Sequence, residues 1–195
     1  ARYIHLWQKG FAIKRSDGII CVSKNTKKDL MRFYPDIEES KLKVIYNGVG
    51  DEFKKLNSAK DCLTSNFEIL KNKKYILYIG DRSNYKNFNI AIEVLSNLED
   101  YSFVVIGGSE FSHIESGKMM SIKNRTYHFR GVKGDALNII YNNAFCLLYP
   151  SSYEGFGIPI IEAMKSGCPV VSVNVSSIPE VAGNDSAAPI TCSFP

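Results

Sequence analysis

The chain has 195 residues with a formal net charge of +4, and 45% of its residues are hydrophobic. This composition excludes a disordered tail, a collagen-like rod and a disulfide-stapled miniprotein, and no uncharged apolar run reaches the roughly 20 residues of a membrane span. The positive excess lies in residues 1–50, which fits either a solvated surface or peripheral contact with an anionic membrane surface. The basic residues do not cluster, so nucleic acid is not an expected partner.

Along the chain, apolar runs typical of strands alternate with segments of helical period. Strands are predicted at 18–23, 42–46, 74–80, 101–107, 126–130, 144–149 and 170–173, and helices at 25–34, 87–98, about 110–122, 134–143 and 158–166. Several strands are apolar on both faces, which is typical of parallel sheets covered by helices on both sides. The alternation predicts the α/β class, with a Rossmann-like, doubly wound parallel sheet and helices on both faces.

A change in composition follows the second predicted strand. Asn47 and Gly48 precede a polar stretch that extends from Asp51 to Lys60. This pattern indicates either a domain boundary or a tight turn inside one domain.

The five cysteines are Cys21, Cys62, Cys146, Cys168 and Cys192, and no two of them have CxxC spacing. Apolar neighbours of Cys21 and Cys146 favour small buried thiols over disulfides or metal ligands. That usage predicts a reducing compartment.

Ligands of an open α/β sheet bind beyond the carboxyl ends of its strands. The loop after the strand at 74–80 carries Arg82 and Lys86, and a helix begins near Asn87. Two cations and the positive end of a helix dipole suit a diphosphate. Solvated loop side chains are the alternative interpretation.

A second candidate segment follows the strand at 144–149. Glu154 lies in a loop, and Gly155 and Gly157 allow backbone amides to approach a ligand closely. A helix that begins near Pro159 places Glu162 about one turn in. Two carboxylates and free N–H donors match the hydroxyls and phosphates of a sugar nucleotide. The alternative interpretation is an ordinary turn followed by a glutamate that only interacts favourably with the helix dipole.

The run YPSSYEGFGIPIIEAMKSGCPVVSVNVSSIPEVAGN resembles the donor-site signature of retaining glycosyltransferases of family 4, glycosyl transferases of group 1 with the GT-B fold. The signature has two glutamates separated by seven residues, here Glu154 and Glu162. The segments SDGIICVSKNTKKDL, LKVIYNGV, YILYIGDRSNYKN and YHFRGVKGDALNIIYNNA agree in order and spacing, so the resemblance covers nearly the whole chain.

The resemblance implies transfer of a sugar from a nucleoside diphosphate sugar to a hydroxyl of a glycan or lipid-linked acceptor, with retention. It implies that residues 1–48 are the end of an N-terminal acceptor domain plus linker, and that residues 49–195 are a C-terminal donor domain truncated at its end. We therefore expect this chain alone to bind donor without transferring it. The implied setting is cell-surface polysaccharide or glycolipid assembly in the cytoplasm, at the inner face of the membrane.

Site residues carry over one by one from the resemblance. Arg82 and Lys86 are expected to hold the diphosphate, although the family more often has arginine where Asp81 stands. Glu154 is expected to contact the transferred sugar as the catalytic carboxylate, and Glu162 to bind the ribose. The remaining donor contacts are expected from the amides of Gly155, Phe156, Gly157 and Ile158, and from Val132 near the base. No metal or cofactor is expected, because fixed cations and amides neutralise the leaving diphosphate.

Two other functions remain open at this point. A sugar-nucleotide epimerase of the same fold would change the donor without any acceptor. A non-catalytic sugar-nucleotide-binding subunit would bind the nucleotide and release none with any acceptor.

Overall fold

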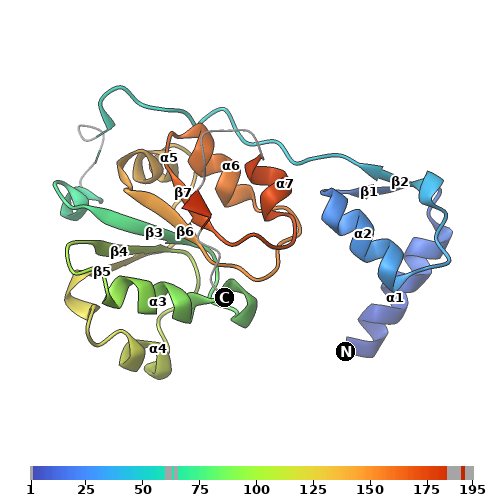
Figure 1. Cartoon of the computed structure of the whole chain (residues 1–195), viewed down its shortest axis with the longest axis horizontal. Helices are drawn as coiled ribbons and strands as arrows, with labels where there is room; N and C mark the ends of the chain where they lie inside the picture. Colours follow the sequence, from blue (N-terminus) through green and yellow to red (C-terminus); the bar gives the residue numbers. More distant parts are fainter. Residues whose placement is uncertain (1, 60–62, 64–65, 184–189, 192–195) are drawn as a thin grey trace.

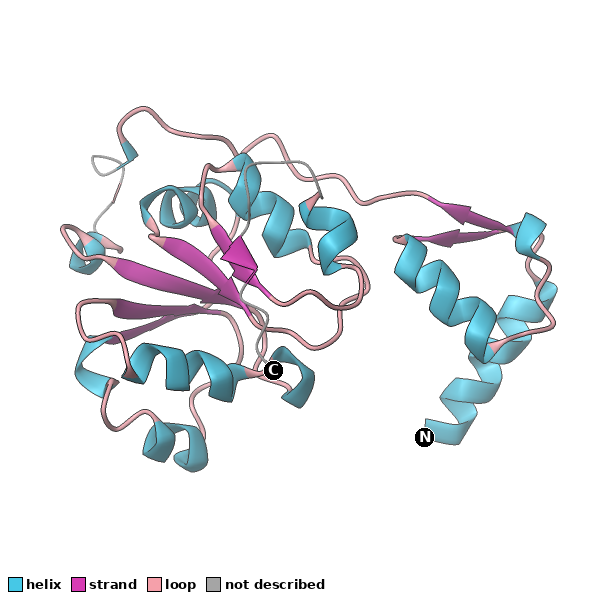
Figure 2. Ribbon diagram, viewed as in Figure 1, coloured by secondary structure: helices cyan, strands magenta, loops and turns pink. Residues whose placement is uncertain are grey.

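In the described part of the chain, the strands of the computed structural model pair in parallel and form two sheets (Figures 1 and 2). The structure describes residues 2–59, 63, 66–183 and 190–191. The smaller sheet pairs β1 (Ile19–Cys21) with β2 (Leu42–Val44). The larger sheet has the order β5-β4-β3-β6-β7-β8. Its strands are β3 (Tyr75–Ile79), β4 (Ser102–Ile106), β5 (Thr126–Phe129), β6 (Cys146–Tyr149), β7 (Val170–Ser172) and β8 (Ile190–Thr191).

Helices cover both faces of the larger sheet (Figure 1). The helices α3 (Phe88–Ser96) and α4 (His113–Lys118) lie on one face, and α5 (Gly134–Asn143), α6 (Ile158–Lys165) and α7 (Ile178–Ala182) on the other. Alternate residues of β3 point to opposite faces: Leu77 belongs to the core with α5–α7, and Ile76 to the core with α3. The predicted α/β fold with helices on both faces is therefore confirmed.

The smaller sheet is accompanied by α1 (Arg2–Arg15) and α2 (Lys24–Phe33) (Figure 1). Residues 45–74 connect the two sheets, and α5 holds part of this connection. The Lys54 N–H donates to Asn138 Oδ1 at 3.1 Å, and the Leu56 N–H donates to Asn142 Oδ1 at 2.8 Å. The domain boundary predicted at residue 48 lies in this connection and stays a prediction.

Most predicted elements are present within one to three residues of their expected ends, and α5 has the predicted bounds. The helix predicted at about 110–122 is shorter, because Ser112 and Glu115 form a capping box that starts α4 at His113, and the helix stops at Lys118. The short elements α7 and β8 were not predicted. Five and two residues are too few for a periodic pattern.

Three cysteines lie in the described part of the structure. Cys21 and Cys146 are free and buried, as predicted, and Cys168 is free and buried as well. Burial raises the pKa of Cys146 to about 11 and of Cys168 to about 12, so both thiols stay protonated near neutral pH. Cys62 and Cys192 fall outside the described residues. Among the described residues, no helix is long and apolar enough to cross a membrane.

Candidate functional site

The strand order of the larger sheet reverses direction between β3 and β6, which lie side by side. The chain leaves β3 toward α3 on one face of the sheet and leaves β6 toward α6 on the other (Figure 1). The loops after these two strands therefore diverge and leave a crevice at their carboxyl ends, where ligands of such sheets bind. Lys86 lies in the first loop and Glu154 in the second.

Lys86 and Glu154 meet in this crevice although they are 68 residues apart in sequence. Lys86 Nζ lies 2.6 Å from Glu154 Oε1, and the two side chains are only 13% and 11% exposed. Lys86 Nζ also contacts the Tyr149 hydroxyl at 3.4 Å. Tyr149 is buried and hydrogen-bonds Glu154, and burial followed by the nearby negative charge raises its pKa strongly. The crevice thus holds a mostly buried cation, a carboxylate and a neutral phenol in mutual contact.

Local structure positions Lys86 at the end of a short 3₁₀ helix, η4 (Asn84–Lys86). Asn87 then adopts the left-handed conformation with φ of 53°, and its side-chain amide donates to Pro150 O at 2.8 Å. This hydrogen bond joins the loop after β3 to the end of β6. It keeps Lys86 beside Glu154.

The loop after β6 leads directly into α6. Gly157 is the N-cap residue of α6 with φ of 100°, where a Cβ atom would lie 3.2 Å from Ile160 Cδ1, so a glycine is required there. Pro159 occupies the first turn, as predicted. In the described part of the chain, the backbone N–H groups of Gly155, Phe156, Gly157 and Ile158 have no hydrogen-bond partner.

These groups line a cavity of about 320 Å³. Lys86, Tyr149, Glu154 and residues 155–159 form most of its wall, together with Ile79 and Gly80 from the end of β3. Val22 and Asn47, which flank the smaller sheet, complete it. A cation, a carboxylate and free backbone amides around one cavity can hold an anionic ligand that also carries hydroxyl groups.

Glu162 lies one turn further along α6 and does not line this cavity. Its Oε2 accepts a hydrogen bond from the buried Tyr141 hydroxyl at 2.9 Å. Burial raises the pKa of Glu162, the Tyr141 hydrogen bond opposes that shift, and the negative charge of Glu52 adds to it. Glu162 is thus a half-buried carboxyl that is harder to ionise than an exposed glutamate.

Arg82 has a different environment from the one expected of a diphosphate ligand. Its guanidinium pairs with Glu115 at 2.7 Å and donates to the carbonyl oxygens of Gly107, Ser109 and Glu110 at 2.7–3.4 Å. It also stacks over Phe111, 4.7 Å from the ring centre, and its side chain is only 5% exposed. In this conformation Arg82 holds the loop after β4 and does not line the cavity. Its role toward a diphosphate stays a prediction.

Val132 follows β5, after Gly131 with φ of 70°. It is partly buried and packs against the core beside α5, outside the cavity wall. In the described part of the chain, no group of three or more His, Cys, Asp or Glu side chains is placed to hold a metal ion.

Sequence reasoning missed Ser176 and Ser177, which fix the loop after β6 from the side of α7. The Ser176 hydroxyl donates to Glu154 O at 2.7 Å, and the Ser177 hydroxyl lies 2.9 Å from Glu154 O and 3.0 Å from Phe156 O. The serine pair in the run VSSIPEV is the only signal in the sequence, and a serine pair before a helix is too common to indicate this role.

Family models match almost the whole chain. The model described as "Glycosyl transferases group 1" matches residues 63–190, and the model "Glycosyltransferase Family 4" matches residues 1–53. A curated relative, the O-antigen chain mannosyltransferase RfbU of Salmonella typhimurium, is 29% identical over 178 residues, which is 89% of this chain and 46% of the relative. The chain therefore spans less than half the length of that relative.

Solved structures agree with the fold. Sucrose-phosphate synthase from Thermosynechococcus elongatus superposes with a TM-score of 0.77 at 21% identity, covering 91% of this chain and 47% of the other. Anabaena HepE in complex with UDP and glucose superposes with a TM-score of 0.73 at 20% identity, covering 88% of this chain and 48% of the other. At these identities the likeness concerns the fold.

Proposed function

Because the chain belongs to the glycosyl transferases group 1 family, we propose that its crevice binds a nucleoside diphosphate sugar and that the protein transfers the sugar to an acceptor hydroxyl with retention. The observation that carries this proposal is the contact of Lys86 with Glu154 beside the free amides at the start of α6. A cation and a helix N-terminus suit the diphosphate, and a carboxylate suits sugar hydroxyls.

Each group has a distinct role in this proposal. Lys86 and the amides of residues 155–158 neutralise the charge that develops on the leaving diphosphate, so no metal ion is required. Glu154, held by Lys86 and Tyr149, contacts the transferred sugar as the catalytic residue. Glu162 accepts hydrogen bonds from the ribose hydroxyls, and Val132 lies near the base.

The acceptor is a glycan or lipid-linked sugar, and the setting is assembly of a cell-surface polysaccharide in the cytoplasm at the inner face of the membrane. The relative named as an O-antigen chain mannosyltransferase supports this setting and makes mannose the first sugar to test. A structure solved with UDP and glucose supports including uridine nucleotides among the donors.

A thermal-shift panel tests donor binding directly. We expect GDP-mannose, UDP-glucose or a related nucleoside diphosphate sugar to raise the melting temperature of the chain in excess EDTA, because a ligand stabilises only the state that it binds. The Lys86→Met variant should show a much smaller shift with the same compound. No shift with any of these compounds, with or without added magnesium, would refute the proposal.

Products separate transfer from the two alternatives. An epimerase of this fold converts the donor without an acceptor, and a binding subunit releases no nucleotide with any acceptor. Transfer requires both substrates, and the anomeric configuration of the product by NMR tests retention.

A further inference from the structure

The middle peptide of the loop after β6 is held from outside the larger sheet. Gly155 O accepts hydrogen bonds from the Ser23 hydroxyl at 2.8 Å and from the Thr26 hydroxyl at 3.0 Å. Both donors belong to the start of α2, beside the smaller sheet, and they are 132 and 129 residues away from Gly155 in sequence. Two donors fill the two lone pairs of this carbonyl oxygen.

The same atoms also build the end of α2. Ser23 is its N-cap residue, and Ser23 Oγ accepts the Thr26 N–H at 2.9 Å. The Ser23 hydroxyl lies within donating distance of Gly155 O at 2.8 Å and of Thr26 Oγ1 at 3.0 Å, and the shorter contact is the one to Gly155. Ser23 is completely buried. The cap of α2 and the contact with the loop are thus one hydrogen-bonded unit.

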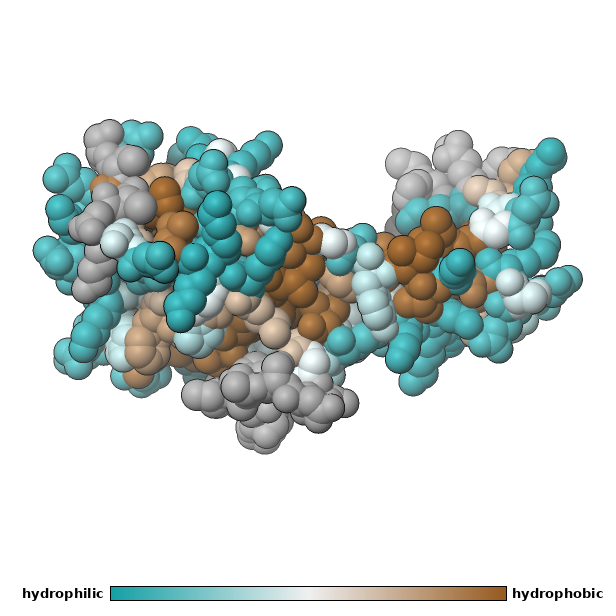
Figure 3. Space-filling view, turned by 90° about the horizontal axis from the view of Figure 1, so that it is seen from above, coloured by the Kyte–Doolittle hydropathy of each residue, from teal (hydrophilic) through white to brown (hydrophobic). Residues whose placement is uncertain are grey.

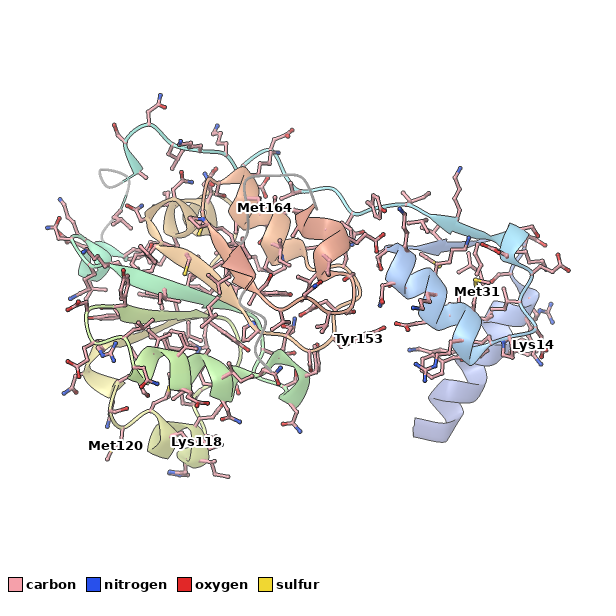
Figure 4. The ribbon with its side chains drawn as sticks, viewed as in Figure 1. Lys14, Met31, Lys118, Met120, Tyr153 and Met164 are labelled. Atoms are coloured by element: carbon pink, nitrogen blue, oxygen red, sulfur yellow. The ribbon has the colours of Figure 1, made fainter. Side chains whose placement is uncertain are left out.

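Further hydrogen bonds attach the first turn of α2 to α7 and to the loop after β6, both of which belong to the part of the chain around the larger sheet. Both carboxylate oxygens of Glu180 accept backbone N–H groups of α2, from Lys24 at 2.7 Å and Asn25 at 3.2 Å. This carboxylate lies at the positive end of the helix dipole. Tyr153, which extends toward α2 in Figure 4, donates its hydroxyl to Asp29 at 2.8 Å. Seen from above, hydrophobic surface borders this junction on both sides (Figure 3).

The fixed carbonyl determines where the neighbouring amide points. In a trans peptide the C=O and N–H groups point in opposite directions, so the Phe156 N–H is turned away from α2. Within the described residues this N–H has no hydrogen-bond partner, and both Gly155 and Phe156 line the cavity that holds Lys86 and Glu154. The adjacent carbonyls of Glu154 and Phe156 are held by Ser176 and Ser177 instead.

We propose that Ser23 and Thr26 are positioning residues of the donor site, which hold the Gly155–Phe156 peptide with its N–H presented to the sugar nucleotide. The donor site is then complete only when α2 is seated on the loop. This inference rests on the proposed function, since it assigns part of the donor site to the start of α2, beside the smaller sheet.

Thr26 offers the cleaner test, because removing the Ser23 hydroxyl also removes the cap of α2. Thr26→Val keeps the shape of the side chain and removes the hydroxyl, which contacts both Gly155 O and Ser23 Oγ at 3.0 Å, whereas Thr26→Ser keeps the hydroxyl. We expect Thr26→Val to weaken binding of GDP-mannose or UDP-glucose roughly 3- to 10-fold by calorimetry, the effect of one lost hydrogen bond. Thr26→Ser should bind like the parent chain. Guanosine and uridine, which carry no phosphate, should bind Thr26→Val and the parent chain equally.

Lys27→Ala is the matched control, because Lys27 lies next to Thr26 on α2 and pairs with Glu39 rather than with the loop. It should leave all affinities unchanged. If Thr26→Val binds the nucleotide sugars as tightly as the parent, or loses nucleoside binding to the same extent, the positioning role is refuted while the donor site stands. If the parent chain binds none of these nucleotides, the proposed function itself fails.

Discussion

Glu154→Gln is the variant with the least obvious expected result, because Glu154 neutralises the cation that is proposed to hold the diphosphate. At 2.6 Å, and with side chains only 13% and 11% exposed, the Lys86–Glu154 pair attracts by about 6 kcal/mol at an effective dielectric constant near 20. Desolvation offsets much of that attraction. Removing one partner should therefore lower the free energy of unfolding by about 2–4 kcal/mol.

The two charges should be coupled in a double-mutant cycle. We expect Lys86→Met and Glu154→Gln each to destabilise the chain in urea denaturation. The double variant should be less destabilised than the sum of the two by about 2 kcal/mol or more, since neither charge is left buried and unpaired. Additive losses would show that the 2.6 Å contact contributes nothing to stability.

Binding of the bare nucleoside diphosphate should separate the two single variants. Glu154→Gln frees Lys86, so UDP or GDP should bind roughly 3- to 10-fold more tightly, whereas Lys86→Met should bind roughly 10- to 100-fold more weakly. Glu39→Gln is the control, because it breaks an ion pair of similar length, 2.8 Å with Lys27, away from the cavity. Weaker binding of the bare diphosphate to Glu154→Gln, measured by calorimetry, would refute this reasoning.

Three further variants test the surroundings of the site. Burial raises the pKa of Glu162, so on acidification this carboxylate should be protonated, and nucleotide affinity should begin to decrease, at a higher pH than for an exposed glutamate. Glu52→Gln removes a negative charge that also raises this pKa, so calorimetric titrations should show the decrease in affinity at a lower pH. In Arg82→Lys, the lysine cannot form the several hydrogen bonds of the guanidinium, so chemical denaturation should show a free energy of unfolding lower by about 1–3 kcal/mol. A simultaneous loss of diphosphate affinity would show that Arg82 also binds the diphosphate. Gly157→Ala should lower stability by at least about 1 kcal/mol, and an unchanged melting temperature would contradict the strain expected at its φ of 100°.

The alternation of strands and helices was predictable because most strands of the larger sheet, such as β3, β4 and β6, are short apolar runs. Lys86 and Glu154 lie in loops that follow the adjacent strands β3 and β6. The sequence therefore predicted that both lie at the carboxyl ends of the strands, but it did not predict their direct contact. Arg82 shows the limit of spacing: its loop position was predicted correctly, yet its bonds go to carbonyls after β4.

The hydroxyls of Ser23 and Thr26 could not be assigned from sequence for a different reason. Their partner is a backbone carbonyl more than a hundred residues away, and a carbonyl carries no residue identity. A local pattern such as an N-cap serine indicates the start of a helix. It says nothing of a second partner outside that helix.

The position of β3 also has a consequence for how the chain folds. β3 pairs with β4, the next strand in sequence, and with β6, which begins only at Cys146. Pairing β3 with β4 closes a short loop, whereas pairing β3 with β6 closes a much longer one and costs more chain entropy. Lys86 and Glu154 belong to different halves of the sheet, so a chain in which only β3, β4 and β5 have assembled has no crevice. Nucleotide binding during refolding would therefore report when the half with β6 and β7 associates with the half with β3, β4 and β5. The rate at which nucleotide binding appears should be lower than the rate at which the core beside α3 is buried.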